Sequence, residues 1–135
     1  MANKIFVNLP VKDLNRSIAF FTKLGFSFNP QFTDETATCM VVSENIFVML
    51  LIESRFAGFT KKSVADATKT TEVLIALDAE SREEVDRIVD AAVAAGGSLY
   101  REPADHGWMY ERSFADLDGH QWEFAYMDMS LLPKE

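Results

Sequence analysis

Residues 11–26 read VKDLNRSIAFFTKLGF, and this stretch decides how the first half of the chain folds. Asp13 can accept hydrogen bonds from the free N–H groups of a first helical turn. Gly25 can adopt the left-handed conformation that ends a helix. Between these two residues, apolar side chains recur at helical spacing: Leu14, Ile18, Phe21 and Leu24. The stretch therefore predicts one amphipathic helix with defined ends.

Strand-like segments lie on both sides of this helix. Residues 5–11 (IFVNLPV) alternate in polarity, which places Phe6, Asn8 and Pro10 on one face of a predicted strand. Three further strands are predicted after the helix, at 26–32, 37–42 and 46–52. Glu44-Asn45 marks a hairpin turn between the last two, since Asn tolerates a positive φ.

The second half of the chain repeats this order. Residues 54–71 are polar and predict a connection with one turn of helix. A strand at 71–78 is followed by a helix that starts with a Ser81/Glu84 capping box and stops at Gly96-Gly97. Three strands are then predicted at about 98–102, 109–115 and 121–127, with a hairpin turn at Asp118-Gly119. Both halves thus read strand, helix and three strands, which indicates a duplicated module.

Composition limits the classes of partner. The chain has 135 residues, one Cys and a net charge of −8, which predicts one compact domain without disulfides and argues against nucleic acid and anionic membranes as partners. Residues 1–67 carry seven basic and six acidic side chains (+1), and residues 68–135 carry six and fifteen (−9), which together give −8. The N-terminal residues lack the features of a signal peptide, so a cytoplasmic location is expected.

Two motifs resemble those of a known superfamily. The first is V-x-D-L-x-x-S-x-x-F-F-x-x-L-G-F at residues 11–26, and the second is F-x-D-x-D-G-H-x-W-E at residues 114–123. Together, in corresponding halves of a duplicated chain, they resemble the glyoxalase/bleomycin resistance protein/extradiol dioxygenase superfamily, also called vicinal oxygen chelate proteins.

The resemblance implies an α+β fold in which two tandem βαβββ modules form a cupped mixed β-sheet with helices outside. The modules would span about residues 1–53 and 71–128, joined by a connection at about 54–70 and followed by a short C-terminal tail, within a single domain. It also implies a homodimer with a small-molecule site inside the cup. Fold alone does not set the chemistry, because members include metal-dependent enzymes and proteins that only sequester a drug.

The resemblance also assigns four positions to metal ligands in the metal-dependent members: Phe6, Met49, Leu74 and Glu123. Only Glu123 carries a donor suited to a divalent cation, and a catalytic zinc or iron usually takes about three protein ligands. No cofactor is therefore predicted, although a divalent metal stays possible if Asn8, Glu53 or Glu72 fills in. Phe and Met would instead form a polarisable wall for an aromatic or aliphatic ligand.

Further candidate ligand contacts follow from strand alternation. If Glu123 faces the cup, Gln121 and Ala125 face it too, while Trp122, Phe124 and Tyr126 pack against helices. Asn8 shares a face with Phe6 and predicts a hydrogen bond to the ligand. The segment 105–112 (DHGWMYER) adds four candidates: His106, Trp108, Tyr110 and Arg112. Asn8, Tyr110, Arg112 and Glu123 are expected to converge on one cavity.

The sequence thus predicts a small-molecule-binding protein with a degenerate metal site and a partly apolar or aromatic ligand. The alternative is a glyoxalase- or dioxygenase-like enzyme, in which Glu123 acts as acid or base, or as ligand of a divalent metal.

Overall fold

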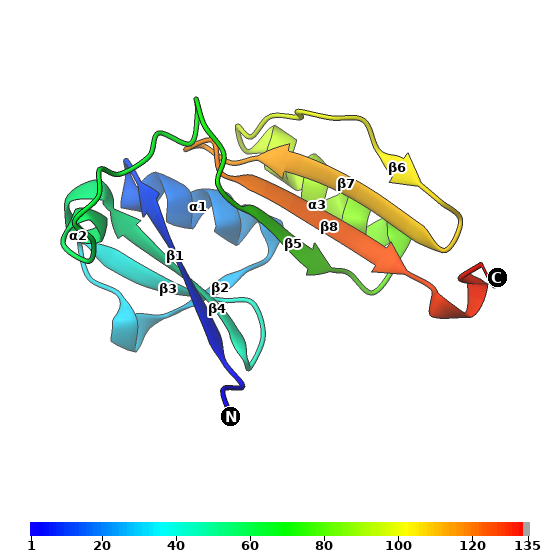
Figure 1. Cartoon of the computed structure of the whole chain (residues 1–135), viewed down its shortest axis with the longest axis horizontal. Helices are drawn as coiled ribbons and strands as arrows, with labels where there is room; N and C mark the ends of the chain where they lie inside the picture. The colour runs from blue at the N-terminus through cyan, green and yellow to red at the C-terminus, as the bar shows by residue number, and fades with distance from the viewer. Residues whose placement is uncertain (134–135) are drawn as a thin grey trace. The chain divides into compact units, whose positions relative to one another are not determined.

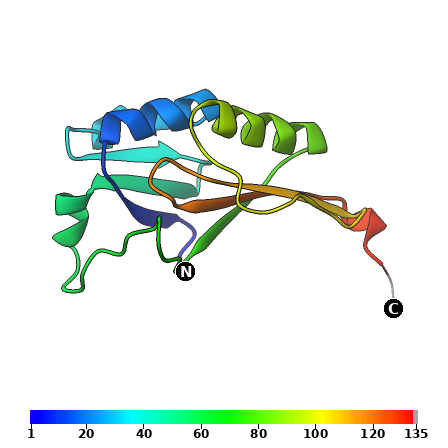
Figure 2. The ribbon, with the colours of Figure 1, turned by 90° about the horizontal axis from the view of Figure 1, so that it is seen from above.

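The computed structural model describes residues 1–133 of the chain. The chain divides into two compact units, Met1–Ala65 and Asp66–Glu135. Each unit contains one four-stranded mixed sheet with a long helix along one face (Figures 1 and 2). The boundary between the units falls inside the connection expected at 54–70.

The first unit has the strand order β1-β4-β3-β2. Strand β1 runs parallel to β4, and the remaining pairs are antiparallel. Its elements are β1 (Ile5–Val11), α1 (Leu14–Leu24), β2 (Ser27–Asn29), the 3-10 helix η1 (Pro30–Phe32), β3 (Ala37–Val41), β4 (Ile46–Ile52) and α2 (Glu53–Ala57).

The second unit has the corresponding strand order, β5-β8-β7-β6, with the same parallel and antiparallel pairs. Its elements are β5 (Leu74–Asp78), α3 (Arg82–Ala94), β6 (Ala104–Asp105), β7 (Met109–Ala115), β8 (Gln121–Met127) and the 3-10 helix η2 (Met129–Leu131). The predicted α+β class with two modules is therefore confirmed.

Most of the predicted helix-end contacts form. The Asp13 carboxylate accepts a hydrogen bond from the Arg16 N–H at 3.1 Å, and Gly25 ends α1 with a φ of 105°. In α3 the Ser81 hydroxyl accepts from the Glu84 N–H at 3.0 Å. The Glu84 carboxylate, however, accepts from the Glu80 N–H rather than from Ser81, so only half of the capping box forms.

One face of each sheet packs against the long helix of its unit, and the face away from that helix is called the open face (Figure 2). In the first unit the buried side chains of Leu9, Val48 and Leu50 lie on the α1 side. In the second unit Phe114 stacks between Trp122 and Phe124 on the α3 side, with ring centroids 6.5 and 5.9 Å apart. This confirms that Trp122 and Phe124 are core residues, and it leaves Glu123 on the opposite face.

Some predicted local structure is wrong. Residues 98–102 form no strand, apart from one bridge between Ser98 and Ala115. The run 26–32 keeps only three strand residues, because Pro30 begins η1. The β3–β4 turn uses no positive φ at Asn45, and among the described residues only glycines adopt positive φ.

The β7–β8 turn is fixed by tight contacts within the second unit. Gly119 has a φ of 88°, and a Cβ built there would lie 2.8 Å from Ala67 and Thr68 backbone atoms. The buried Asp116 carboxylate accepts hydrogen bonds from the backbone N–H groups of Asp118 and His120, at 2.9 and 3.0 Å. The turn that precedes Glu123 is therefore rigidly placed.

Candidate functional site

The open faces of the two sheets hold most of the residues that the sequence assigns to a ligand. In the first unit Asn8 of β1 pairs with Met49 of β4, so their side chains share the face away from α1. Phe6 lies on the same face and stacks on Phe47, with ring centroids 4.8 Å apart and planes inclined by 12°. Three predicted residues are thus brought onto one surface.

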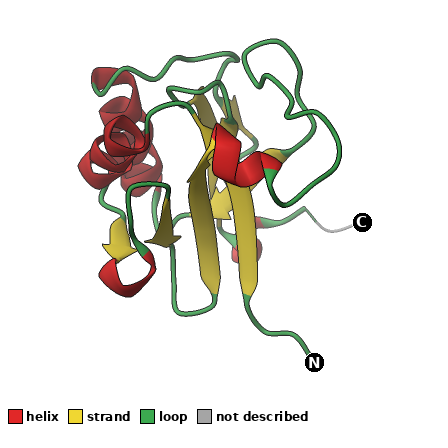
Figure 3. Cartoon of the chain, turned by 90° about the vertical axis from the view of Figure 1, so that its left-hand side faces the viewer, coloured by secondary structure: helices red, strands yellow, loops and turns green. Residues whose placement is uncertain are grey.

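A cavity of about 290 Å³ lies on this open face, near the lower end of the range for small-molecule sites. Both apolar and polar side chains line it. They are Asn8, Gln31, Phe32, Thr33, Asp34, Ala37, Met49, Leu51, Arg55 and Phe59. The cavity lies wholly within the first unit, and Figure 3 shows this unit toward the viewer.

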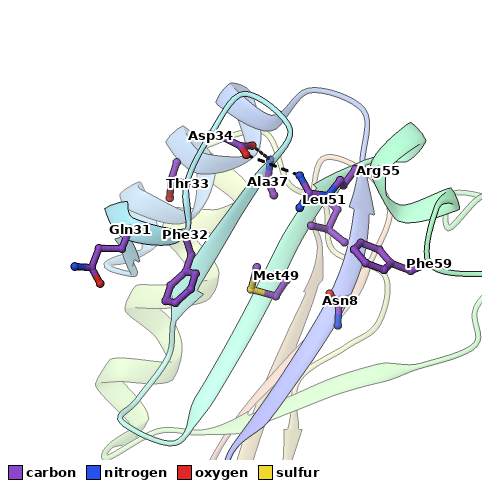
Figure 4. Close-up of a pocket in the computed structure, with 10 residues that line it drawn as sticks. All are labelled: Asn8, Gln31, Phe32, Thr33, Asp34, Ala37, Met49, Leu51, Arg55 and Phe59. Carbon is purple, nitrogen blue, oxygen red and sulfur yellow. Dashed lines mark hydrogen bonds and ion pairs between the residues drawn. The ribbon is translucent and has the colours of Figure 1, made fainter.

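Two phenylalanines stand at opposite sides of the cavity. Phe32 comes from η1 and Phe59 follows α2, and Met49 lies between them on the sheet (Figure 4). Phe32 and Phe59 are 61% and 70% exposed, which is unusual for aromatic residues. Exposed rings facing one cavity can stack on a planar ligand.

Arg55 supplies the positive charge of the cavity. Its Nη1 donates a hydrogen bond to the Thr36 hydroxyl at 2.7 Å and lies 3.8 Å from the Asp34 carboxylate. Its guanidinium also lies over the Phe59 ring, 6.0 Å from the centroid. Asp34 accepts three hydrogen bonds from Thr36 and Ala37, and those from Thr36 are the main reason that the pKa of Asp34 is lowered. The cavity thus offers a guanidinium beside an aromatic ring.

The open face of the second sheet carries both polar and apolar side chains. Leu74 pairs with Gln121, and Ala76 pairs with Glu123, which in turn pairs with Ser113 of β7. Leu74 is exposed, whereas Glu123 is only 9% exposed. Arg101 Nη2 lies 2.8 Å from the Glu123 carboxylate and also contacts the Glu111 carboxylate. One guanidinium therefore joins two glutamates on this face.

Tyr110 and Arg112 lie on the other face of this sheet. The Tyr110 hydroxyl donates to Asp86 of α3 at 2.6 Å, and Arg112 Nη1 donates to Asp86 and Asp90, each at 3.0 Å. Burial and the Asp86 hydrogen bond raise the pKa of Tyr110. The prediction that these residues converge with Glu123 on one cavity is wrong, because they differ from Glu123 in strand parity and face the helix.

The remaining candidates lie on the loop before β7. His106 is exposed, and its backbone N–H donates a hydrogen bond to the Met109 carbonyl. Trp108 is half-buried in the bend before β7 rather than in the strand, and its carbonyl accepts from the Asp128 N–H. Neither residue is paired in the second sheet, so strand alternation does not place either side chain on the face that carries Glu123.

The four positions that the resemblance assigns to metal ligands do not make a donor set for a divalent cation. Phe6, Met49 and Leu74 offer no oxygen or nitrogen donor, and Glu123 is bound by Arg101. Across residues 1–133, no group of three or more His, Cys, Asp or Glu side chains is arranged to hold a metal ion. The side chains present therefore do not fit the metal centre of the metal-dependent members.

Sequence reasoning missed Phe32, Arg55, Phe59 and Arg101. All four lie outside the long strands, in η1, in α2 or in irregular segments. Strand alternation makes no statement about such residues. The one signal in the sequence is the presence of Phe and Arg in otherwise polar connections, where a large exposed side chain has no core to join.

Comparisons with known proteins place the chain among related sequences and folds. The family model described as "Glyoxalase/Bleomycin resistance protein/Dioxygenase superfamily" matches residues 5–124. A solved structure described as hypothetical protein SA1046 from S. aureus is 33% identical, with a TM-score of 0.78 over 93% of this chain and 95% of that chain. No curated protein matches.

Two more distant structures share the fold. A glyoxalase/bleomycin resistance protein/dioxygenase family enzyme from Burkholderia phytofirmans PsJN is 19% identical, with a TM-score of 0.74 over 90% of this chain and 96% of that chain. The fosfomycin resistance protein FosX from Listeria monocytogenes is 20% identical, with a TM-score of 0.68 over 100% of this chain and 96% of that chain.

Within residues 1–133, no helix has the length and hydrophobicity needed to cross a membrane.

Proposed function

The chain belongs to the glyoxalase/bleomycin resistance protein/dioxygenase superfamily, and from this premise we propose that it binds a small, partly apolar or aromatic molecule on the open face of its first sheet. The observation that carries the proposal is the pair of exposed rings, Phe32 and Phe59, on either side of Met49 (Figure 4). Asn8 and Phe6 lie on the same face, as the sequence predicts for ligand contacts.

The charges in the cavity favour a ligand with an anionic group. Arg55 donates to the Thr36 hydroxyl and lies over the Phe59 ring, and both contacts orient its guanidinium before a ligand binds. Its 3.8 Å separation from Asp34 is long for a charge-assisted hydrogen bond. A planar aromatic anion would therefore place its ring between the phenylalanines and its charge near Arg55.

Two fluorescent probes with a common ring system test this proposal. The anionic probe is 8-anilinonaphthalene-1-sulfonate, and the uncharged probe is N-phenyl-1-naphthylamine. We expect the double change Phe32→Ala and Phe59→Ala to weaken binding of both probes by about 10-fold, since two stacking contacts of about 0.5–1.5 kcal/mol each are lost. Arg55→Gln should weaken only the anionic probe, by about 5-fold, because one cation–π and charge contact of about 1 kcal/mol is lost.

Ile5→Ala is the matched control, because Ile5 is an exposed apolar residue of the same unit that does not line the cavity. It should leave both probe affinities unchanged. If the control weakens binding as much as the Phe32/Phe59 double change, the probes bind apolar surface in general and the proposed site is refuted.

An enzymatic role of Glu123 is the second candidate, and the burial of this carboxylate on the open face of the second sheet favours it. In that case Glu123 would act as acid or base, with Gln121 and Leu74 beside it in the sheet. His106 and Trp108 stay proposed contacts, because the loop that carries them leads into β7. Metal retained by the purified chain and lost in Glu123→Gln would instead support a metal-ligand role.

A homodimer in the cytoplasm is the proposed state of the protein. Dimerisation is common among superfamily members that bind small molecules, and this expectation rests on membership alone. Light scattering should give twice the mass of one chain. A monomer at micromolar concentration would contradict it.

A further inference from the structure

Arg101 and two glutamates form a compact cluster on the open face of the second sheet. Arg101 Nη2 contacts the carboxylates of Glu111 and Glu123, the latter at 2.8 Å. The glutamate side chains are 16% and 11% exposed, whereas the arginine side chain is 42% exposed. Two poorly solvated carboxylates thus depend on one guanidinium for their countercharge.

An irregular segment delivers this guanidinium. Ser98 bridges to Ala115, and Ala104 pairs with Glu111. Between these two pairings the segment advances by six residues, from 98 to 104, whereas β7 advances by only four, from 111 to 115. The segment therefore contains two extra residues. Extra residues of this kind lift a strand from its partner and redirect side chains, often beside functional sites. Here the displaced segment contains Arg101.

Two buried hydroxyl groups lie beside the cluster. Ser113 pairs with Glu123 across the sheet and is 2% exposed. Its Oγ and the Tyr100 Oη are both buried, and Tyr100 shares a side-chain hydrogen bond with Ser113. Two carboxylates and two hydroxyls are all oxygen donors of the kind that hard cations prefer.

We propose that Arg101 is the built-in cation of this site and keeps divalent cations out of it. The guanidinium lies where a metal ion bridging Glu111 and Glu123 would have to bind, so the native chain has no free carboxylate pair there. Removing Arg101 would leave the two carboxylates with no cation and turn the cluster into an oxygen-ligand site. This inference concerns the second sheet, so it stands or falls separately from the proposed ligand site on the first sheet.

Titration with Mn²⁺, with free Mn²⁺ followed by electron paramagnetic resonance, tests the inference. Arg101→Ala and Arg101→Gln should each bind one Mn²⁺ with an affinity at least 10-fold above any Mn²⁺ affinity that the native chain shows. Adding Glu123→Gln or Glu111→Gln to Arg101→Ala should remove this gain. Circular dichroism identifies any variant that fails to fold, and Arg101→Gln keeps most of the side-chain volume.

Arg82→Ala provides the matched control. Arg82 lies in the same unit, its side chain is 39% exposed, and it pairs with a single carboxylate, Asp105, at 2.8 Å. The change alters net charge equally but frees no carboxylate pair, so Mn²⁺ affinity should stay near that of the native chain. If Arg82→Ala increases Mn²⁺ affinity as much as Arg101→Ala does, the increase is explained by net charge alone and the inference is overturned.

The native chain provides a second, independent test that needs no folded Arg101 variant. It should bind no Mn²⁺ at this site. Stoichiometric Mn²⁺ binding by the native chain that is lost in Glu123→Gln would overturn the inference, and so would folded Arg101 variants with unchanged affinity.

Discussion

Replacing Asp116 by alanine is expected to lower the free energy of unfolding by about 4 kcal/mol. The Asp116 carboxylate accepts from the Asp118 and His120 N–H groups and from the Trp122 indole N–H, the last at 3.0 Å. Trp122 is fully buried. A buried donor left without an acceptor costs about 1–3 kcal/mol, and alanine removes the acceptor from three donors at once. Urea unfolding followed by tryptophan fluorescence measures the change.

Asp34→Ala is the control for this prediction. Asp34 also accepts three hydrogen bonds, from Thr36 and Ala37, but its carboxylate is exposed. Water can replace the exposed acceptor, so the loss should be much smaller than that of Asp116→Ala. Asp116 is only 7% exposed, and this burial raises the pKa of its carboxyl. Equal losses in the two variants would mean that burial of Asp116 does not matter.

The fold was largely predictable because its signals are local. The helix over Leu14–Leu24 has a capping residue at one end and Gly25 at the other, and both form as expected. Strands β1, β4, β7 and β8 match their predicted bounds, because alternation over seven residues is a strong periodic signal. Short edge segments were less predictable, since β6 has only two residues and depends on pairing with β7.

The sheet faces of the candidate site were predictable only in part. Alternation correctly predicts Glu123 opposite Trp122 and Phe124, and Asn8 beside Phe6. The prediction fails for Tyr110 and Arg112, because their polar side chains face the acidic side of α3 rather than a ligand. The partly exposed carboxylates of Asp86 and Asp90 on α3 can satisfy a half-buried arginine as well as a ligand can.

Contacts from irregular segments lay beyond sequence reasoning. Arg101 reaches Glu123 through two extra residues in the pairing with β7, and no periodicity marks such an insertion. Arg55 and Phe59 reach the cavity because α2 lies on the opposite side of the first sheet from α1 (Figure 2). Local propensity predicts that a turn of helix forms there but not which face of a sheet it covers.

Replacing Arg112 by alanine is expected to lower the free energy of unfolding by about 3 kcal/mol, the second largest effect. Arg112 joins β7 to α3 through Asp86 and Asp90, and its side chain is only 16% exposed. Truncating one member of a buried hydrogen-bonded charge pair costs about 2–5 kcal/mol. The lower part of that range applies, because both aspartates are partly exposed and water screens them. Urea unfolding at pH 7 measures the change.

The pH dependence of the same variant distinguishes a helix contact from a ligand contact. The Tyr110 hydrogen bond, and after it Arg112, lower the pKa of Asp86. A lowered folded-state pKa adds stability that is present above the unfolded value of about 4 and is lost as the pH falls through the folded value. The difference in the free energy of unfolding between the native chain and Arg112→Ala should therefore shrink as the pH falls below about 4. At pH 7, Arg112→Ala should leave the affinity for both naphthalene probes unchanged. If Arg112→Ala keeps the native stability but binds the probes more weakly, Arg112 contacts the ligand, as the sequence alone predicts, and the expected role in stability is wrong.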